Sequence, residues 1–490
     1  MKSIVEQVFE HALRMPEKVA LTDGKKIISF HDLVCQILYA KKLLTNKYDI
    51  KKGDKVIISA SKQLTFVPVY LACHLLSATA LPIAPDTNLQ RFNSIYNKVF
   101  PKLIVGFDVD NTSCAKVDLS EFVGENYFVY DEDIVFPDEG ALADIIFTTG
   151  TTGEPKGVQL TQKNIAAAAA NINAFIQNSS EDVEMLALPI SHSFGLGRLR
   201  CALSNGQTVV ILGSFANIKR FFRYMEEFHV TGFGMVPSSW AMLKKLSGTK
   251  IKDYAKQLHY IEIGSAPMSM DEKKLLIDIL PKTRICMHYG LTEASRSCFM
   301  ELHESIAWLD TIGKPSPNIH VEIMDEVGKI VPEGTEGEIC VSGDAVTVGY
   351  LISAIDNKDY FWGEFLRTGD WGVKDSNGRI KLSARKRELI NVGGKKVSPN
   401  EVEDFLNSID FVKESVCIGI PDSSGVLGEV VKAYIVTDHP EQVCIENIRK
   451  ICRGRLEDYK IPSECQVIDS IPKTSSGKIC RVSLKEHRYH

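Results

Sequence analysis

The 490-residue sequence contains no Cys-x-x-Cys pair and no His and Cys spacing typical of a zinc site, although it has 12 cysteines. Structural zinc and dithiol redox chemistry therefore have no support. The scattered cysteines are expected to be reduced, mostly buried residues of a cytoplasmic protein. The amino-terminal residues also lack an uninterrupted apolar stretch, so no secretory signal peptide is expected.

Long apolar runs and an excess of positive charge are missing as well. The most apolar window, residues 66–85, contains Pro68, His74 and Pro82, so a buried helix followed by a strand is a better prediction than a membrane span. The net charge of −5 and the pI near 6.2 give no reason to expect nucleic-acid binding. The Walker A and G-x-G-x-x-G patterns are absent too.

Apolar runs rich in β-formers alternate with helical stretches over roughly the first 300 residues, which predicts an α/β fold. Residues 165–177 are predicted to form a helix capped by Thr161. A buried strand is predicted at 258–264, and helices are predicted at 271–280 and 446–459. From about Asp310 strands joined by Gly- and Pro-containing turns predict a small β-rich unit, and the length of the chain predicts more than one domain.

A glycine- and threonine-rich loop is the most informative feature of the chain. An apolar strand ending near Phe147 leads into Thr-Thr-Gly-Thr-Thr-Gly-Glu-Pro-Lys-Gly, residues 148–157. Glycine lets the backbone approach a ligand closely, and successive N–H groups can then surround phosphate oxygens. Threonine hydroxyls and Lys156 add donors and a positive charge. The loop predicts a polyphosphate ligand, although an ordinary surface turn can have the same composition.

Further motifs follow in the order found in the adenylate-forming superfamily, which includes acyl-CoA synthetases, peptide-synthetase adenylation domains and luciferases. Residues 264–267, Gly-Ser-Ala-Pro, resemble the family's turn beside the adenine, and residues 288–293, His-Tyr-Gly-Leu-Thr-Glu, resemble its Tyr-Gly-x-Thr-Glu motif. Gly337-Glu338 with Gly349-Tyr350, Arg367-Thr368-Gly369-Asp370, the hinge region from Arg385, and Pro-Lys-Thr-Ser-Ser-Gly-Lys at 472–478 resemble the later motifs. The chain is identified as a member of the AMP-dependent acyl-CoA synthetase branch.

This resemblance implies an α/β protein of two domains. A large N-terminal adenylation domain, residues 1–386, is expected to hold two βαβ-type subdomains and a small β-barrel. A small, mobile α+β C-terminal domain, residues 387–490, is expected to carry the catalytic Lys478. Arg387 occupies the hinge position, where the family usually has Asp or Lys.

The implied reaction has two halves. The carboxylate of a small acid attacks the α-phosphate of ATP, which gives acyl-AMP and pyrophosphate, and a thiol then attacks the activated carbonyl. Lys478 would bridge carboxylate and phosphate oxygens, and Thr292 would donate to the α-phosphate. Glu293 would hold Mg²⁺, which prefers oxygen ligands; without the motif, Thr-Glu would also fit the start of a helix.

The resemblance assigns the remaining roles. Asp370 and Arg385 would bind the ribose, and His192 would lie beside the carboxylate and the thiol entrance. Rotation of the small domain would withdraw Lys478 and bring Gly393 and Gly394 to the thiol tunnel. The predicted catalytic residues are Lys478, Thr292, Glu293 and His192, and the predicted ATP- and AMP-binding residues are Thr148, Thr149, Gly150, Thr151, Thr152, Gly153, Lys156, Ser265, Ala266, Pro267, His288, Tyr289, Gly290, Thr292, Asp370 and Arg385.

The acid is only partly specified by the sequence. Amino-acid-activating relatives carry an aspartate just after the position of His192, where this chain has Ser-Phe-Gly. Because a buried ammonium group is costly without a carboxylate, a fatty, aryl or other small organic acid is expected. Its pocket is predicted from residues 194–200, 235–240 and 264–267 and from residues after Glu293.

The thiol is either coenzyme A or the phosphopantetheine arm of an acyl carrier protein. Asp422-Ser423 fits a solvated turn better than a carrier domain, so a stand-alone enzyme that loads a carrier protein is the alternative to an acyl-CoA synthetase. A luciferase-like oxidoreductase and a non-catalytic nucleotide-binding relative are less favoured, since nothing suggests oxygen chemistry and Lys478, Glu293 and Asp370 are all present. A homodimer is compatible with each assignment.

Overall fold

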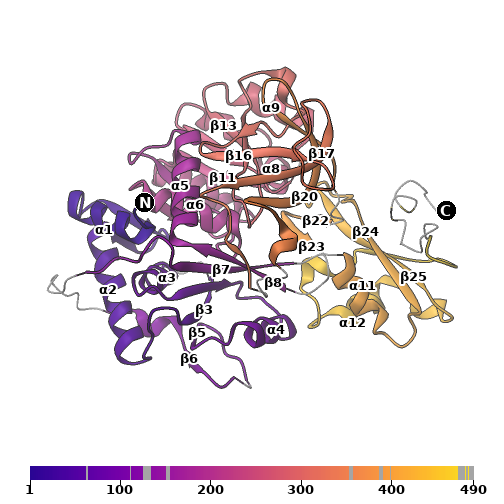
Figure 1. Cartoon of the computed structure of the whole chain (residues 1–490), viewed down its shortest axis with the longest axis horizontal. Coiled ribbons are helices and arrows are strands. Elements are labelled where there is room, and N and C mark those ends of the chain that lie inside the picture. The colour runs from indigo at the N-terminus through magenta and orange to yellow at the C-terminus, as the bar shows by residue number, and fades with distance from the viewer. Residues whose placement is uncertain are drawn as a thin grey trace.

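The computed structural model describes the chain except residues 62–63, 111, 125–133, 150–154, 267, 352–356, 386–389, 398, 473–480, 482–483 and 485–490. Two large sheets flanked by helices make up most of the molecule, and a third sheet and a carboxy-terminal unit complete it (Figure 1). The predicted α/β fold class is therefore confirmed.

The first sheet has nine strands in the order β15-β14-β13-β12-β11-β9-β10-β1-β2, parallel at its centre and antiparallel at its edges. Chain order reverses between β9 and β11, because β9 leads through α6 to β10 on one side and the chain then returns through α7 to β11. Such a reversal opens a crevice at the carboxyl ends of the strands. The strands are β1 (Val19–Thr22), β2 (Ile27–Ser29), β9 (Val183–Leu186), β10 (Thr208–Ile211), β11 (Gly232–Met235), β12 (Tyr260–Ile263), β13 (Arg284–Tyr289), β14 (Cys298–Glu301) and β15 (Lys314–Pro315), and the helices are α6 (Ser193–Ser204), α7 (Ile218–Glu227), α8 (Pro237–Ser247) and α9 (Met270–Ile279).

The second sheet has seven strands in the order β18-β8-β7-β4-β3-β5-β6. Its α3 and β4 are wholly buried, which confirms the helix and strand predicted over residues 66–85. The predicted cap of α5 is also present, since Thr161 Oγ1 accepts from the Asn164 N–H at 3.1 Å. The elements are β3 (Lys55–Ser59), β4 (Thr79–Ile83), β5 (Leu103–Val105), β6 (Ala115–Val117), β7 (Leu142–Thr149), β8 (Pro155–Thr161) and β18 (Gly349–Tyr350), with α1 (Ile4–Arg14), α2 (Phe30–Asn46), α3 (Phe66–Leu75), α4 (Leu89–Val99) and α5 (Gln162–Ile176).

The third sheet is antiparallel and corresponds to the β-rich unit expected after Asp310. It contains β16 (Ile319–Met324), β17 (Glu336–Gly343), β19 (Phe361–Trp362), β20 (Phe365–Lys374) and β21 (Ile380–Arg385). Single turns of 3-10 helix cover Leu119–Phe122, Lys250–Tyr254, Ile306–Trp308, Lys358–Tyr360, Pro440–Gln442 and Asp458–Lys460.

The carboxy-terminal unit has cores of its own. Its two clusters of buried apolar side chains draw only on residues from Ile390 to Leu484. The helix predicted at 446–459 ends early, at Cys452, because Gly454 turns the chain with a φ of 75°. The elements are β22 (Ile390–Val392), β23 (Lys395–Val397), β24 (Glu414–Pro421), β25 (Glu429–Val436) and β26 (Glu464–Val467), with α11 (Pro399–Asn407) and α12 (Ile445–Cys452).

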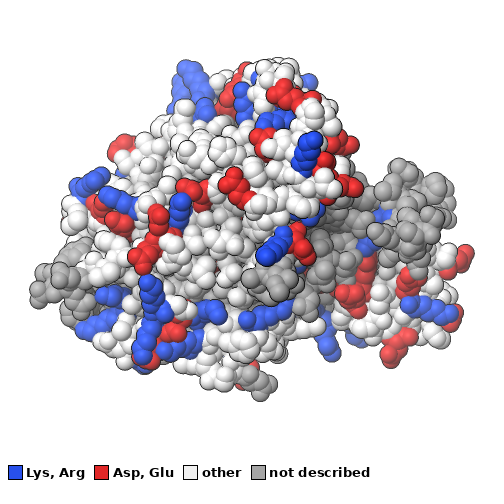
Figure 2. Space-filling model, viewed as in Figure 1, with Lys and Arg blue, Asp and Glu red and all other residues white. Residues whose placement is uncertain are grey.

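The surface carries both signs of charge. Lys and Arg side chains are interspersed with Asp and Glu side chains over the face drawn in Figure 2. No helix in the described part of the chain combines the length and the apolar character that a bilayer crossing requires.

Candidate active site

The crevice at the reversal of chain order gathers residues from several strand ends. The segment after β9 leads to His192 and Phe194 at the start of α6, and β11 leads to Val236 just before α8. Phe194, Val236 and Leu188 pack together as a small apolar cluster. The structure thereby brings together two of the segments predicted for the acid pocket, residues 194–200 and 235–240.

The predicted adenine-side turn lies against β13. A Cβ at Gly264 would stand 2.1 Å from ring atoms of His288, so a residue larger than glycine would not fit. The His288 side chain is 6% exposed, and its Nδ1 lies 2.7 Å from Glu262 Oε1. Burial lowers the pKa of His288 although Glu262 opposes the shift, so the ring is neutral at pH 7. Ser265 and Ala266 follow, half-buried, and Ser265 adopts a left-handed φ of 71°.

Thr292 and Glu293 lie in a loop after β13, and no helix begins there. Thr292 Oγ1 donates to Ser193 Oγ at 3.2 Å, which ties this loop to the start of α6. The buried Glu293 carboxylate accepts from Tyr350 Oη at 2.5 Å. Gly290, between β13 and this loop, leaves no room for a Cβ, which would stand 2.4 Å from the Arg296 backbone nitrogen.

Two tyrosine side chains, Tyr360 and Tyr350, lie between Lys156 and the Glu293 carboxylate. Its Nζ donates to Tyr360 Oη at 2.7 Å, and the Tyr360 and Tyr350 ring centroids are 4.5 Å apart. Lys156 was predicted to face phosphate; in this structure its hydrogen bond goes to Tyr360. Tyr360 carries no signal in the sequence, because it stands outside the recognised motifs.

The two residues predicted to bind ribose are adjacent. Asp370 is 5% exposed in β20, and its cross-strand partner in β21 is Arg385. Tyr289 Oη donates to Asp370 Oδ2 at 2.6 Å. Burial, with Asp370 alongside, raises the pKa of Tyr289, so the phenol stays protonated and can donate.

The glycine-rich segment joins the antiparallel strands β7 and β8, in which Thr148 faces Lys156 and Thr149 faces Pro155. The predicted residues Gly150, Thr151, Thr152, Gly153, Pro267, Arg387 and Lys478 lie outside the described residues. Just beyond Lys478, Arg481 pairs with Glu403 at 2.8 Å and Leu484 packs near Tyr434, so both side chains belong to the carboxy-terminal unit.

The predicted thiol-tunnel residues form the turn between β22 and β23. Gly393 and Gly394 have φ of 59° and 84°, a pair of positive values that glycine adopts readily in a two-residue hairpin turn. A Cβ at Gly394 would stand 3.0 Å from Val236 Cγ1, and Asn391 Nδ2 donates to the Ser265 carbonyl at 3.1 Å. The hairpin therefore reaches the crevice of the large domain.

His192 lies at this junction of the two domains. Desolvation and then the cations of Lys395 and Arg91 lower the pKa of its ring, against Asp86. The side chain nevertheless remains exposed to solvent, which limits the size of the shift. The imidazole is neutral at pH 7.

A buried cluster of charged residues, missed in the sequence analysis, stands behind Phe194. Arg198 Nε donates to Glu184 Oε1 at 2.9 Å and Arg198 Nη1 to Glu262 Oε2 at 3.2 Å. Arg296 Nε donates to Glu262 Oε1 at 2.9 Å, and Arg296 Nη2 donates to the Phe194 carbonyl at 3.2 Å. These pairs fix α6 against β9 and β12 and tie the loop after β13 to the start of α6.

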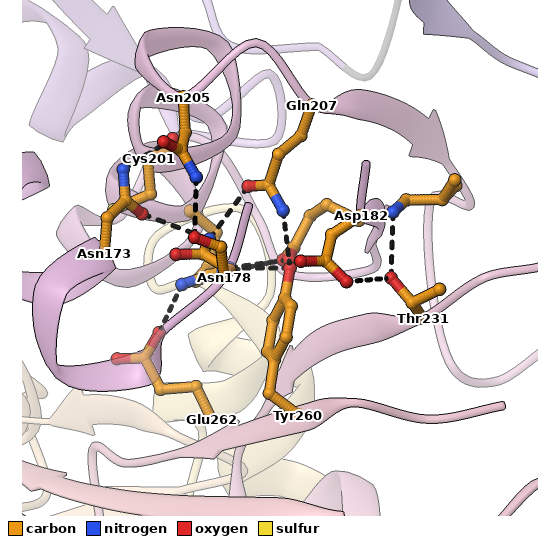
Figure 3. Close-up of polar contacts among 12 residues, drawn as sticks. Asn173, Asn178, Asp182, Cys201, Asn205, Gln207, Thr231, Tyr260 and Glu262 are labelled. Carbon is orange, nitrogen blue, oxygen red and sulfur yellow. Dashed lines mark hydrogen bonds and ion pairs between the residues drawn. The ribbon is translucent and has the colours of Figure 1, made fainter. Parts of the chain in front are cut away.

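The charged cluster extends into a polar network at the other ends of the strands. The Tyr260 hydroxyl contacts Glu184 and accepts from Gln207 Nε2 at 3.3 Å, and Gln207 Oε1 accepts from Asn178 Nδ2 at 2.9 Å (Figure 3). The sequence did contain one indication of this cluster, a glutamate within each of the apolar strands β9 and β12. A buried charge requires a partner, so such glutamates predict buried ion pairs.

Comparison with known proteins supports the same assignment for both domains. The family model of the AMP-binding enzyme matches residues 8–351, and that of the AMP-binding enzyme C-terminal domain matches residues 401–478. The oxalate–CoA ligase of Arabidopsis thaliana is 28% identical over 97% of this chain and 96% of its own length.

Two solved structures of one enzyme, the o-succinylbenzoate CoA synthetase of Bacillus subtilis, differ in their likeness to this chain. A double mutant bound with its product analogue OSB-NCoA has a TM-score of 0.88 at 25% identity, with 98% of both chains covered. The complex with the acyl-adenylate intermediate OSB-AMP has a TM-score of 0.72 at 26% identity, again with 98% of both chains covered. The chain thus belongs to the AMP-binding enzyme family of the adenylate-forming superfamily, in the acyl-CoA ligase branch of AMP-forming acid–thiol ligases.

Proposed function

We propose that this ligase activates a small organic acid without an α-amino group as acyl-AMP and then transfers the acyl group to coenzyme A. The observation that carries the proposal is the position of the Gly393-Gly394 turn, which packs against Val236 at the mouth of the crevice. The two comparisons with one synthetase, at near-equal identity, favour the form bound to a coenzyme A product analogue, 0.88 against 0.72. Both findings support a small domain arranged for transfer to a thiol.

Adenylation would use the nucleotide-facing residues of the large domain. Asp370 and Arg385 would hold the ribose, and Thr292 would donate to the α-phosphate. The glycine-rich segment after β7 would surround the remaining phosphates, with Lys156 nearby. Lys478 would stabilise the charge that develops as the acid attacks, after a rotation of the small domain.

Glu293 fits a single carboxylate ligand for Mg²⁺. Among the described residues no group of three or more His, Cys, Asp or Glu side chains is placed to hold a metal ion. Phosphate oxygens of ATP and water would therefore complete the coordination, as Mg²⁺ usually requires. When bound, the ion would neutralise phosphate charge, while Tyr350 would hold the Glu293 carboxylate in position.

His192 would act by position in the second half-reaction. A lowered pKa makes its ring a weak base, so we assign it a steric role rather than proton transfer. The ring would line the path between the acyl carbonyl and the thiol. The Gly393-Gly394 turn would leave space there for the pantetheine arm, because neither residue carries a side chain.

We place the domain boundary between residues 386 and 387, since the described apolar clusters separate between Ile380 and Ile390. The cysteines that the structure describes are free thiols, most of them buried. That pattern suits a reducing compartment such as the cytoplasm, and a homodimer stays a prediction.

Pyrophosphate release with a panel of acids, with and without coenzyme A, tests the proposed function. Mass spectrometry should find AMP and an acyl-CoA thioester when coenzyme A is present. A reaction that yields a thioester only with a phosphopantetheinylated carrier protein would transfer the assignment to carrier loading, and release of ADP would refute acyl-adenylate chemistry.

A further inference from the structure

Arg296 holds two parts of the candidate site together. It lies in the loop after β13, and its side chain is 2% exposed. Its Nη1 donates to the Ser193 carbonyl at 3.3 Å and its Nη2 donates to the Phe194 carbonyl at 3.2 Å. Both carbonyls belong to the start of α6. One guanidinium therefore joins the loop that carries Thr292 to the helix that begins beside His192.

An ion pair with β12 fixes the direction of this guanidinium. Arg296 Nε donates to Glu262 Oε1 at 2.9 Å, and Arg296 Cζ lies 4.7 Å from the centroid of the Phe194 ring. Burial opposes the ionisation of Glu262, but the Arg296 cation above all holds the pKa of this carboxyl well below its usual range. Glu262 is therefore a carboxylate, and its charge keeps the guanidinium beside the start of α6.

The backbone at Arg296 is in a conformation that arginine rarely adopts. Its φ of 53° lies in the left-handed region, where any side chain larger than that of glycine costs free energy. Glycine would remove this cost but could make none of the contacts described above. Gly197, one turn after Ser193 in α6, leaves the space that the guanidinium needs, because a Cβ there would stand 2.4 Å from Arg296 Nη1. The contact therefore requires arginine at one position and glycine at the other.

We propose that Arg296 is a positioning residue that aligns the acid-facing start of α6 with the α-phosphate site. This inference rests on the proposed function, in which Thr292 donates to the α-phosphate. Thr292 Oγ1 donates to Ser193 Oγ at 3.2 Å, so Ser193 is the point at which the two parts of the site meet, and Arg296 holds its carbonyl. A start of α6 that is held less firmly would bind the acid less well and misplace it, and an error of about 1 Å in the placement of reacting atoms can slow a reaction about 100-fold.

Arg296→Lys removes this bridge and keeps the positive charge. A lysine ammonium can pair with Glu262 but lacks the planar donor set that reaches both carbonyls as well, and the contact between Glu262 and His288 on the adenine side, 2.7 Å, is retained. The KM for the acid should therefore rise about 10- to 100-fold, the effect of losing hydrogen bonds from a charged donor, while the KM for ATP stays within twofold of wild type. A purely structural role would lower the amount of active enzyme and leave both KM values unchanged.

Gly197→Ala tests the same contact without changing Arg296. The added Cβ would displace Nη1, whereas alanine favours the helix itself, so the KM for the acid should again rise by about 10-fold or more. In an Arg296→Lys background the same substitution should have no further effect on this KM, because the displaced atom is gone. Arg198→Lys is the matched control. Arg198 pairs with Glu184 and Glu262 farther along α6, so its substitution should lower the melting temperature but leave the KM for the acid within twofold of wild type.

ATP–pyrophosphate exchange with the acid that reacts fastest in the panel measures both KM values, and Gly197→Ala decides the question if Arg296→Lys does not give folded protein. An equal rise of the KM for the acid and for ATP overturns the inference, as does an unchanged KM for the acid in Gly197→Ala or an equal rise in Arg198→Lys. Each of these outcomes leaves the ligase function intact. Absence of exchange with every acid in the wild-type protein overturns the proposed function as well.

Discussion

Replacing Arg91 with alanine should slow thiolation and spare adenylation. Arg91 of α4 reaches across the domain junction, with Nε 3.8 Å from Glu457 Oε1 and Nη1 4.0 Å from Glu401 Oε1. The Arg91 side chain is only 13% exposed. Lys460 contacts the same two carboxylates at 2.6 and 2.8 Å, so two cations balance two anions. The substitution removes one cation from the junction and leaves an excess of negative charge.

The magnitude follows from these distances. Two unit charges 4 Å apart attract by about 4 kcal/mol at an effective dielectric constant of about 20, and desolvation offsets part of this gain. Truncating one member of a largely buried charge pair typically costs about 2 kcal/mol or more. If the contact forms only when the small domain is arranged for thiolation, a loss of about 2 kcal/mol lowers the population of that arrangement about 30-fold.

Separate assays of the half-reactions measure this effect. ATP–pyrophosphate exchange without coenzyme A should stay within twofold of wild type in Arg91→Ala, whereas single-turnover consumption of preformed acyl-AMP on addition of coenzyme A should slow about 30-fold. Arg223→Ala is the matched control, because its pair with Glu227 is exposed, at 64% and 48%, and exposed pairs contribute little. Equal slowing of both half-reactions, or equal effects of the two substitutions, would refute the reasoning.

Three further predictions concern the junction and the small domain. Gly394→Val should reduce thiolation at least 10-fold but spare ATP–pyrophosphate exchange, since its Cβ would stand 3.0 Å from Val236; Gly425→Val, at a φ of 69° with nothing within 4 Å, controls for backbone strain, and equal effects would contradict the contact. Lys478→Ala should lower exchange by orders of magnitude while a supplied acyl-AMP still reacts with coenzyme A, and matched losses would argue against domain alternation. Because desolvation at the domain junction and the cations of Lys395 and Arg91 lower the pKa of His192 from 6.5, the unfolded chain binds a proton there more readily than the folded protein does. This residue should therefore destabilise the protein as the pH falls below about 6.5 and have no effect above it. NMR titration of the His192 ring measures the shift, and a midpoint of 6.5 would exclude it.

Local patterns in the sequence were sufficient for several elements of the fold. The Thr161 cap and the apolar residues after it predicted α5, and the apolar run at 258–264 predicted the buried strand β12. The helix expected at 446–459 was too long, because the φ of Gly454 depends on a turn that periodicity does not reveal. Propensity therefore located elements better than it located their ends.

The candidate site was predictable where a motif marks it and not where packing creates it. Asp370 and Tyr289 come from recognised motifs, and the structure joins them with a hydrogen bond. Arg198, Glu184 and Glu262 belong to no motif, and their pairing depends on which strands become neighbours. The same holds for Arg91 and Glu457, which come from different domains, since a single sequence without an alignment does not specify a contact so distant along the chain.

An oxygen-isotope experiment tests the central claim most directly. The acid with the highest rate in the panel is supplied with both carboxylate oxygens labelled with ¹⁸O, together with unlabelled ATP and coenzyme A. If the carboxylate attacks the α-phosphate and the thiol then displaces AMP, one labelled oxygen should appear in AMP and one should remain in the thioester carbonyl. Unlabelled AMP, or label in inorganic phosphate, would contradict an acyl-adenylate intermediate.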